Sequence, residues 1–285
     1  MRINRGKFKT TVLSRPVTIA PLALDPFTAR LAEEIGFKAA YLSGGGLGYQ
    51  LALSEALLSV TEIASAATAI TRRSGLGLIV DGGVGFGDPV HATRMMWDLE
   101  QAGAAGVEIE DQVAPKRVSH HRGVEHLVPT GEMVAKIKAV VAARDDPDFI
   151  IIARTGGVKE GGFDHAIERA KAYRDAGADM IMMFPTTEDD WEKAPELLQT
   201  PMVAIEPFGR RTNEEWDQLG YQLVIDAFTA QVLAYETVRD AYTKGFNGEP
   251  SRSRTDLWRL YGELNVVAGL EELYEIERAT TEPGT

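Results

Sequence analysis

Eight short apolar runs alternate with amphipathic stretches along this chain, and the alternation predicts a (β/α)8 TIM barrel. Strands that alternate with helices need crossover connections and therefore form a parallel sheet. Eight such units over about 230 residues fit the usual size of such a barrel. The expected strands are residues 17–20, 39–43, 76–80, 106–109, 149–154, 180–184, 202–205 and 223–226.

The amphipathic stretches predict the helices that cover this sheet. They include residues 61–72, 89–102, 130–143 and 163–176. Asp88 followed by Pro89 is typical of an N-cap with proline in the first helical position. Thr130, with Glu132 close behind it, predicts the start of another helix.

Glycines before the expected strands support the barrel. Gly36, Gly103 and Gly177 each come where a helix should end shortly before the next strand begins, as short αβ loops require. A doubly wound open sheet is the alternative, but it usually has fewer units and a phosphate-binding fingerprint. The glycine-rich run at residues 83–87 lacks the G-x-G-x-x-G spacing of that fingerprint.

The C-terminal part should lie outside the barrel. A closing helix is expected over residues 227–243, breaks follow at Gly245, Gly248 and Pro250, and one last apolar helix is expected over 255–279. That helix needs a surface to bury, either on a neighbouring subunit or on its own barrel. We expect residues 1–245 to form the barrel domain and 246–285 a helical extension for assembly into a homo-oligomer.

Composition narrows the function classes. The formal charge of −12 argues against a nucleic-acid partner, which needs a positive surface. Because the sequence of 285 residues contains no Cys, disulfides, thiolate metal ligands and cysteine nucleophiles are excluded. No window approaches the roughly 20 apolar residues of a membrane span, and no signal-peptide pattern follows the basic N-terminus. We expect a soluble, cytoplasmic protein whose partner is a small molecule.

Polar residues gather at the expected C-terminal ends of the strands, where barrel enzymes place their chemistry. Three glycines after Ser43 offer bare backbone N–H groups to an anion, although a simple tight turn would look the same. A guanidinium at Arg154 suits a carboxylate, or a salt bridge to a neighbouring acid. The other candidates are Asp81 as metal ligand, charge partner or cap, Glu110 as metal ligand, and Asp111 as a support for the metal ligands or a structural ion pair. Glu206 would restore one negative charge to the site or face a helix, and the part of Asp226 stays open.

The run over residues 107–122 is the most informative segment, because an expected strand ends in carboxylates and continues into Lys, Arg and His. Buried charges are costly unless paired or coordinated, so the run suits a metal ion or an anionic substrate. Lys116 and His120 are the basic candidates of this loop. The remaining histidines carry no assignment: His121 and His126 fall in the loop, and His91 and His165 are expected on helix surfaces.

Five short motifs in order resemble the isocitrate lyase/phosphoenolpyruvate mutase superfamily, nearest its methylisocitrate lyase branch. They are Tyr41-Leu42-Ser43-Gly44-Gly45, Val80-Asp81 with Gly85-Phe86-Gly87, Ile109-Glu110-Asp111-Gln112, Pro115-Lys116-Arg117 with His120, and Ile152-Ala153-Arg154-Thr155. The resemblance covers nearly the whole chain. It implies a barrel whose C-terminal helix is exchanged between neighbours in a dimer-of-dimers tetramer. It also implies Mg²⁺ or Mn²⁺, a small 2-oxo or 2-hydroxy acid, and cleavage or formation of C–C or P–C bonds through an enolate.

The resemblance also implies roles for single residues. The carboxylate-binding turn of the family matches Ser43, Gly44 and Gly45, and its metal site matches Asp81 and Glu110. The mobile catalytic loop of the family matches Lys116 and His120. Its substrate-binding arginine matches Arg154.

Several positions depart from the family pattern. Val118 replaces the Cys that acts as acid/base in the lyases, and a valine cannot move a proton. The Asp-Ala-Asp metal motif reads Asp81-Gly82-Gly83, which weakens the expectation of Mg²⁺ because a hard cation needs oxygen ligands. By spacing, Ser54 stands where the family has a further Asp. The remaining departures are Thr186 for a Glu and Gly156 for an Asp.

Three hypotheses follow. The first is a lyase-type enzyme that is not a Cys-dependent isocitrate or methylisocitrate lyase and that cleaves or decarboxylates a small acid; a hydrolase or phosphonate-processing member is its variant. The second is a carboxylate-binding or regulatory protein without catalysis. The third is metal-free catalysis with Glu206, His120 or Glu110 as general base. Retention of Lys116, His120 and Arg154 together favours an enzyme.

Overall fold

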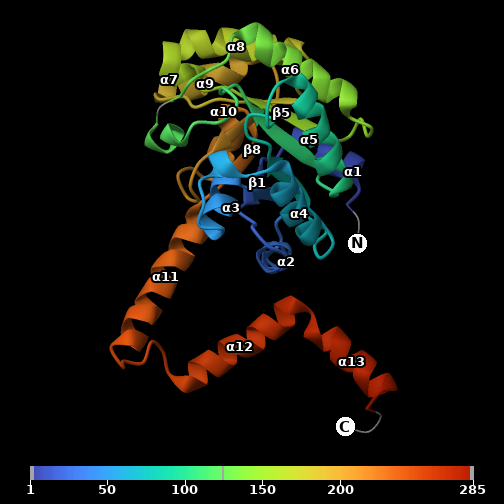
Figure 1. Ribbon diagram of the computed structural model, residues 1–285, viewed down its shortest axis with the longest axis vertical. Coiled ribbons are helices and arrows are strands. Elements are labelled where there is room, and N and C mark those ends of the chain that lie inside the picture. The colour runs from blue at the N-terminus through green and yellow to red at the C-terminus, as the bar shows by residue number, and fades with distance from the viewer. Residues whose placement is uncertain (1–2, 124, 283–285) are drawn as a thin grey trace.

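The computed structural model describes residues 3–123 and 125–282, and it confirms the (β/α)8 barrel (Figure 1). Eight strands pair in parallel in the order β1-β8-β7-β6-β5-β4-β3-β2, and a bridge between Leu22 and Tyr41 joins β1 to β2. The strands are β1 (Thr18–Pro21), β2 (Ala39–Leu42), β3 (Gly77–Asp81), β4 (Gly106–Glu110), β5 (Ile150–Arg154), β6 (Met180–Met182), β7 (Met202–Ile205) and β8 (Tyr221–Asp226).

The strands are buried on both faces, as parallel strands in α/β proteins usually are. One face of each strand packs against the helices in the larger apolar core. The other face fills the barrel interior with side chains that include Tyr41, Ile79, Ile152, Met182, Val203 and Leu223. The barrel therefore has a packed centre, and its chemistry is left to the strand ends.

The expected covering helices form close to their expected bounds, and Gly36, Gly103 and Gly177 all take positive φ, as the short αβ loops require. The helices and 3₁₀ turns of the barrel are α1 (Arg5–Leu13), α2 (Pro26–Ile35), α3 (Gly44–Gln50), η1 (Glu55–Leu57), α4 (Val60–Thr71), α5 (Pro89–Gln101), η2 (Val118–Arg122), α6 (Thr130–Ala143), α7 (Gly157–Gly161), α8 (Phe163–Asp175), α9 (Glu188–Leu198) and α10 (Asn213–Leu219).

Helix α1, which the sequence pattern did not predict, belongs to the interior core at the opposite end from the polar strand ends. Phe8 and Val12 on this helix are buried with the interior residues of the strands. The Phe8 ring lies so close to Gly77 that a Cβ there would come within 2.0 Å of it. Only glycine fits at the start of β3 because this ring occupies the side-chain space.

Three C-terminal helices extend away from the barrel: α11 (Thr229–Phe246), α12 (Arg254–Ala268) and α13 (Leu270–Thr280) (Figure 1). The prediction of one continuous last helix was wrong, because Gly269 takes a left-handed conformation (φ +77°) that ends α12. Arg30 on α2 donates to the Val267 carbonyl, so the end of α12 rests on the barrel of its own chain. Within the described ranges, no helix combines the length and apolarity needed to cross a membrane.

Candidate active site

Four buried or nearly buried carboxylates converge with two permanent cations at the C-terminal ends of the strands. Asp81 ends β3, and Glu108 and Glu110 share one face of β4 because side chains two residues apart point the same way. Arg154 ends β5 directly beside Glu110 in the strand register. The fourth carboxylate is Glu55 on η1, and the second permanent cation is Lys116 in the loop after β4.

The guanidinium of Arg154 lies between the two carboxylates of β4. Its Nη1 donates to Glu108 Oε1 at 3.0 Å, and its Nη2 lies 3.4 Å from Glu110 Oε2. The hydroxyl of Tyr41 donates to the other oxygen of Glu108 at 2.6 Å, so Glu108 has a partner on each oxygen. Burial favours the neutral form of Arg154, but the nearby Glu110 and Glu108 charges outweigh it and raise its pKa. Arg154 is thus a fixed positive charge with 18% of its side chain exposed.

Asp81 is held by backbone amides on both sides. The amide of Gly44 donates to one oxygen at 3.0 Å and that of Gly83 to the other at 2.9 Å. Burial, followed by the negative charges of Glu108 and Glu55, raises the pKa of Asp81 to about 7. Among the described residues, the cluster brings four carboxylates together with three cationic side chains, which are Arg154, Lys116 and His120.

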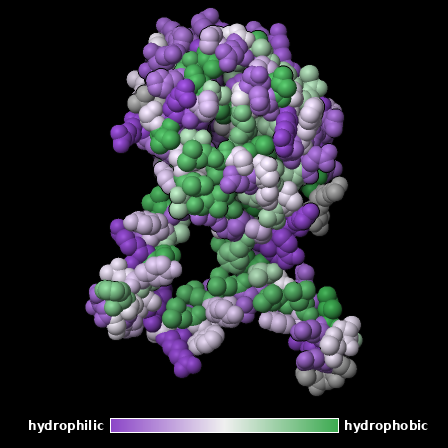
Figure 2. All heavy atoms as spheres, in the orientation of Figure 1, coloured by the Kyte–Doolittle hydropathy of each residue, from purple (hydrophilic) through white to green (hydrophobic). Residues whose placement is uncertain are grey.

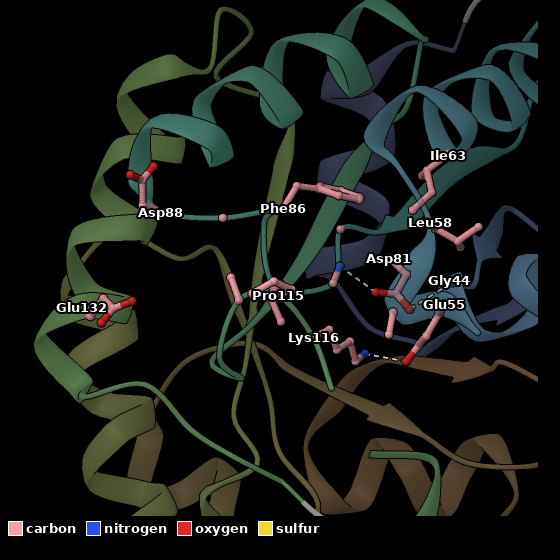
Figure 3. A pocket seen from close by; sticks show the side chains of 16 residues that line it. Gly44, Glu55, Leu58, Ile63, Asp81, Phe86, Asp88, Pro115, Lys116 and Glu132 are labelled. Atoms are coloured by element: carbon pink, nitrogen blue, oxygen red, sulfur yellow. Dashed lines mark hydrogen bonds and ion pairs between the residues drawn. The ribbon is translucent and has the colours of Figure 1, made fainter. Parts of the chain in front are cut away.

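The loop after β4 reaches back over the cluster through Lys116 (Figure 3). The Lys116 ammonium lies 2.6 Å from Glu110 Oε1 and 2.5 Å from Glu55 Oε1, so it bridges a strand end and η1. Burial by itself would lower the pKa of Lys116, but the charges of Glu110 and Asp81 raise it above its usual range. Burial would raise the pKa of Glu110, but Arg154 and Lys116 hold it below its usual range.

His120 joins the same Glu55 oxygen from the other side. Its Nδ1 lies 2.6 Å from the Arg117 carbonyl oxygen, which can only accept, so Nδ1 carries a proton. Its Nε2 faces the Glu55 carboxylate, which is also an acceptor. Burial lowers the pKa of His120, but the Glu55 hydrogen bond and the Arg117 carbonyl raise it above the ordinary value. The geometry favours the imidazolium form.

Glu55 is the anchor on which the loop closes. Burial would raise its pKa, but the His120 hydrogen bond and the charge of Lys116 hold it at about 2. Ser54, which spacing had placed opposite a family Asp, instead makes a 3.0 Å contact with the exposed His121. Glu55, the next residue, supplies the carboxylate to the cluster in its place.

The glycine turn after β2 is a helix start. Ser43 caps α3, and its Oγ accepts the Gly46 amide at 3.1 Å. The Gly44 amide, expected to hold a substrate carboxylate, holds Asp81 in this structure. Ser43, Gly44 and Gly45 nevertheless lie beside the cluster, because a Cβ on Gly44 or Gly45 would meet Glu55 within 3.4 Å.

The donor chemistry fits a divalent cation such as Mg²⁺. Asp81 and Glu110 offer hard oxygens within a cluster that has excess negative charge. Among the described residues, no three His, Asp or Glu side chains are placed to share one ion. A cation would therefore take these two carboxylates and complete its shell with water and substrate oxygens, as Mg²⁺ commonly does. Lys116, which now contacts Glu110, would have to release it.

Other candidates lie away from the cluster. Asp226 accepts the amides of Phe208 and Thr229, so its carboxylate caps backbone. Glu206 faces Arg210 at 3.4 Å, and burial raises its pKa. Three other histidines make exposed side-chain contacts: His91 with Asp88, His165 with Glu160, and His121 with Ser54. His126 is exposed, and its carbonyl accepts the Val113 amide.

Three contributors were missed from the sequence: Tyr41, Glu55 and Glu108. The period of two along a strand could have found Glu108, which shares a face with Glu110, and Tyr41, which shares one with Ser43. No sequence signal identifies Glu55, because its approach depends on how the segment after α3 returns to the barrel.

Comparison with known proteins agrees with this geometry. Residues 8–245 match the family described as phosphoenolpyruvate phosphomutase. A 2,3-dimethylmalate lyase of Eubacterium barkeri is 34% identical, over 95% of this chain and 96% of the relative. A probable 2-methylisocitrate lyase of Corynebacterium glutamicum is 40% identical, over 84% and 80% respectively.

Solved structures are similar over almost their full length. An oxaloacetate acetylhydrolase with the inhibitor 3,3-difluorooxalacetate superposes with a TM-score of 0.88 at 25% identity, covering 100% of this chain and 99% of the other. A phosphonopyruvate hydrolase with oxalate and Mg²⁺ gives 0.87 at 26% identity, with 98% and 100% covered. The chain therefore belongs to the phosphoenolpyruvate mutase/isocitrate lyase superfamily of enzymes.

Proposed function

We propose that the chain is a Mg²⁺-assisted carbon–carbon lyase or decarboxylase, acting in the cytoplasm on a small 2-oxo or 2-hydroxy acid through an enolate. The observation that carries this proposal is the unbalanced cluster. Among the described residues, four carboxylates (Asp81, Glu108, Glu110 and Glu55) face three cationic side chains, which are Lys116, Arg154 and His120. Such a cluster suits a site completed by a cation and an anionic substrate.

The fixed cations would bind and orient the acid. Arg154 keeps part of its side chain exposed while Glu108 and Glu110 hold its guanidinium, which preorganises it for a carboxylate. Lys116 can leave Glu55 and Glu110 as the acid enters. The ammonium would then face the oxygen on which the enolate charge develops. The backbone amides of residues 43–45 would bind the other end of the substrate acid.

The metal would be held by Asp81 and Glu110. When bound, it supplies Lewis-acid stabilisation to an oxygen of the enolate. A neutral Asp81 would lose its proton on binding a cation, so its raised pKa makes metal binding pH-dependent.

Proton delivery must differ from that in the Cys-dependent lyases, because Val118 occupies the position of their thiol. Val118 is 56% exposed and carries no titratable group. His120, two residues further along the same loop, has an acceptor at each ring nitrogen and is therefore protonated on both. It can give a proton to a bound acid.

We assign His120 as the acid that gives its proton to the enolate carbon. Solvent water then returns a proton to the imidazole, and the negative charge of Glu55 favours the reprotonated, imidazolium form. Under this assignment, the chain is not a Cys-dependent isocitrate or methylisocitrate lyase.

A turnover screen tests the function. The wild type is incubated with 2-oxo and 2-hydroxy di- and tricarboxylic acids and with phosphonopyruvate, with Mg²⁺ or with EDTA, and products are followed by NMR. We expect cleavage of at least one carboxylic acid, lost with EDTA and in Glu110→Gln. Phosphate release from phosphonopyruvate alone would replace the lyase with a phosphonate-processing hydrolase. Tight binding of acids without any turnover would indicate a carboxylate-binding protein.

The C-terminal helices support a homo-oligomer, with residues 1–245 as the barrel unit and 246–285 as the exchanged extension. Among the described side chains of α11, none is buried, and Tyr242 and Phe246 are 76% and 93% exposed. Figure 2 shows apolar residues gathered along these helices below the barrel. Helices α12 and α13 add Trp258, Tyr261 and Ile276, each more than half exposed. Apolar surface of this extent usually marks an interface.

Sedimentation velocity tests the assembly. We expect a dimer or tetramer for the whole chain and a smaller species for a chain ending after residue 246. A monomer for the whole chain would contradict the exchange and leave packing on its own barrel.

A further inference from the structure

One buried lysine takes no part in the carboxylate cluster at the strand ends. Lys136 on α6 is completely buried, and its ammonium donates to the Val84 carbonyl at 2.6 Å. Among the described residues, this carbonyl is its only hydrogen-bond acceptor, and no carboxylate pairs with the ammonium. Burial lowers the pKa of Lys136, and the charges of Glu132 and Glu110 offset this only in part. A buried cation held by a neutral group is costly to the fold, so its presence points to a role other than stability.

The loop that Lys136 holds, residues 82–87 between β3 and α5, has an unusual backbone. Gly83 and Gly85 have φ of +51° and +77°, and Phe86 has φ of +60°, a conformation that bulky L-residues rarely adopt. Such a backbone persists only where its surroundings hold it in place. The stem of Lys136 lies directly beneath this loop, because a Cβ on Gly85 would come within 3.4 Å of its Cδ.

The same loop fixes both candidate metal ligands. The Gly83 amide donates to the Asp81 carboxylate at 2.9 Å, and the Gly83 carbonyl accepts the Glu110 amide at 2.8 Å. The next carbonyl along the chain, that of Val84, is the one held by Lys136. A shift of Val84 would therefore move Gly83, and with it the contacts to Asp81 and to the end of β4.

Lys136 supports this loop from the side away from the ligand space. A cavity of about 370 Å³ opens beside the cluster, and Asp81, Gly83, Val84 and Phe86 are among the residues that line it (Figure 3). Lys136 is not among them. Its ammonium therefore acts on a bound ion or acid through the loop and not by contact.

We propose that Lys136 is a positioning residue for the divalent cation. By holding the Val84 carbonyl, it fixes the loop after β3 so that Asp81 and Glu110 are both presented to the ion. The inference rests on the proposed function, because that function places the cation at these two carboxylates. It goes beyond that function by assigning the order of the site to a buried residue that touches neither the cation nor the substrate.

Titration with Mn²⁺ tests the role of Lys136 without any need for turnover. Mn²⁺ takes the same kinds of oxygen ligand as Mg²⁺, and its EPR signal broadens when the ion is bound, which gives a dissociation constant. Lys136→Met keeps the apolar stem and removes the ammonium. We expect its dissociation constant for Mn²⁺ to rise at least about tenfold, as for the loss of other groups that orient metal ligands. Circular dichroism and gel filtration establish that the variant is folded.

Two further variants make the test specific. Lys138→Met is the matched control, because Lys138 lies on the same helix and is exposed; its dissociation constant should stay within about twofold of the wild type. Lys136→Gln ends about one bond short of the ammonium. It cannot hold Val84 in the same place, so it should also weaken Mn²⁺ binding, even if Lys136→Met fails to fold.

The proposed function and this inference fail differently. If the wild type does not bind Mn²⁺, the metal of the proposed function falls and the role of Lys136 falls with it. If the wild type binds Mn²⁺ and the folded Lys136 variants bind it within about threefold as tightly, only the inference is overturned. A lower melting temperature with unchanged affinity, or failure of both variants to fold, would make Lys136 a structural residue and overturn it too.

Discussion

Glu110 and Asp111 are neighbours in the chain, but they serve two different charge clusters. Asp111 is completely buried and accepts from Thr155 Oγ1 at 2.6 Å, Arg169 Nε at 2.8 Å, the Tyr173 hydroxyl at 2.8 Å and the Gly156 amide at 3.0 Å. Arg169 also donates to the Val128 carbonyl at 2.7 Å, which ties the end of the loop after β4 to α8.

The Asp111 cluster is complete, whereas the Glu110 cluster is not. One acid meets one guanidinium around Asp111, and both carboxylate oxygens have donors. Around Glu110, burial and then the negative charges of Glu108 and Glu55 raise the pKa of Asp81 to about 7. This difference shows that buried charge alone does not identify an active site. A matched cluster fixes the fold, and an unmatched one leaves room for a cation and a substrate.

The largest effect on turnover is expected for Arg154→Lys. The ammonium keeps the positive charge but loses the two-pronged contact with Glu108 and Glu110 and the fixed plane that binds a carboxylate. We expect kcat/KM to fall at least about a hundredfold, about 2.7 kcal/mol of transition-state stabilisation. Steady-state kinetics with circular dichroism measures both properties. If Arg154→Lys lost folded structure to the same extent as activity, Arg154 would be a structural residue like Asp111, and the proposed difference between the two clusters would be wrong.

Asp111→Ala should act on stability instead. Removing it leaves the buried guanidinium of Arg169 without its acid, which costs about 3–5 kcal/mol. The melting temperature should fall by about 10 °C, while turnover per folded molecule stays within about tenfold. Asp175→Asn is the control, because its pair with Arg174 is 66% exposed on the acid side and worth little. Equal melting temperatures for Asp111→Ala and the control would show that the Asp111 cluster does not stabilise the fold, contrary to this account.

A pH effect should follow from Glu55→Gln. The Glu55 hydrogen bond raises the pKa of His120, so the neutral amide should lower that pKa. The alkaline limb of the kcat/KM profile should then move to lower pH, and NMR titration of His120 should move with it. If the pH profile of kcat/KM did not move, His120 would not be the acid.

The free energy of unfolding should also depend on pH through His120 and Glu55, and the two residues should act in opposite directions. The His120 pKa is raised on folding, so its contribution is full below about pH 6.5, the unfolded value, and is lost as pH rises through the raised value. The Glu55 pKa is lowered, so its contribution is present above its unfolded value and is lost as pH falls towards about 2. Urea unfolding of wild type and Glu55→Gln across pH measures both.

The smallest effect is expected for Val118→Ser. Val118 is 56% exposed, and its side chain carries no charge to the cluster. Turnover should stay within about twofold and the melting temperature within about 1 °C, as for most surface substitutions. A tenfold change in kcat would show that this loop position takes part in the chemistry after all.

Much of the barrel and part of the site could be predicted from sequence. Apolar runs that alternate with amphipathic ones define β/α units, and residues that end such runs, such as Asp81 and Arg154, must meet at one rim. Glu55 could not be found, because only the packed return of η1 brings it to Lys116. Two partners of Asp111, Arg169 and Tyr173, come from α8, far along the chain, so the sequence left its structural role as one of two open interpretations.

Turnover of Glu110→Gln is the most direct test of the central claim, that the unmatched cluster performs the chemistry. Glutamine keeps the shape of the side chain and removes one charge from a cluster with excess negative charge, so the fold should keep its melting temperature within about 3 °C. On the acid that the wild type converts, we predict a fall in kcat/KM of at least about a hundredfold. Turnover within threefold of the wild type would contradict the account.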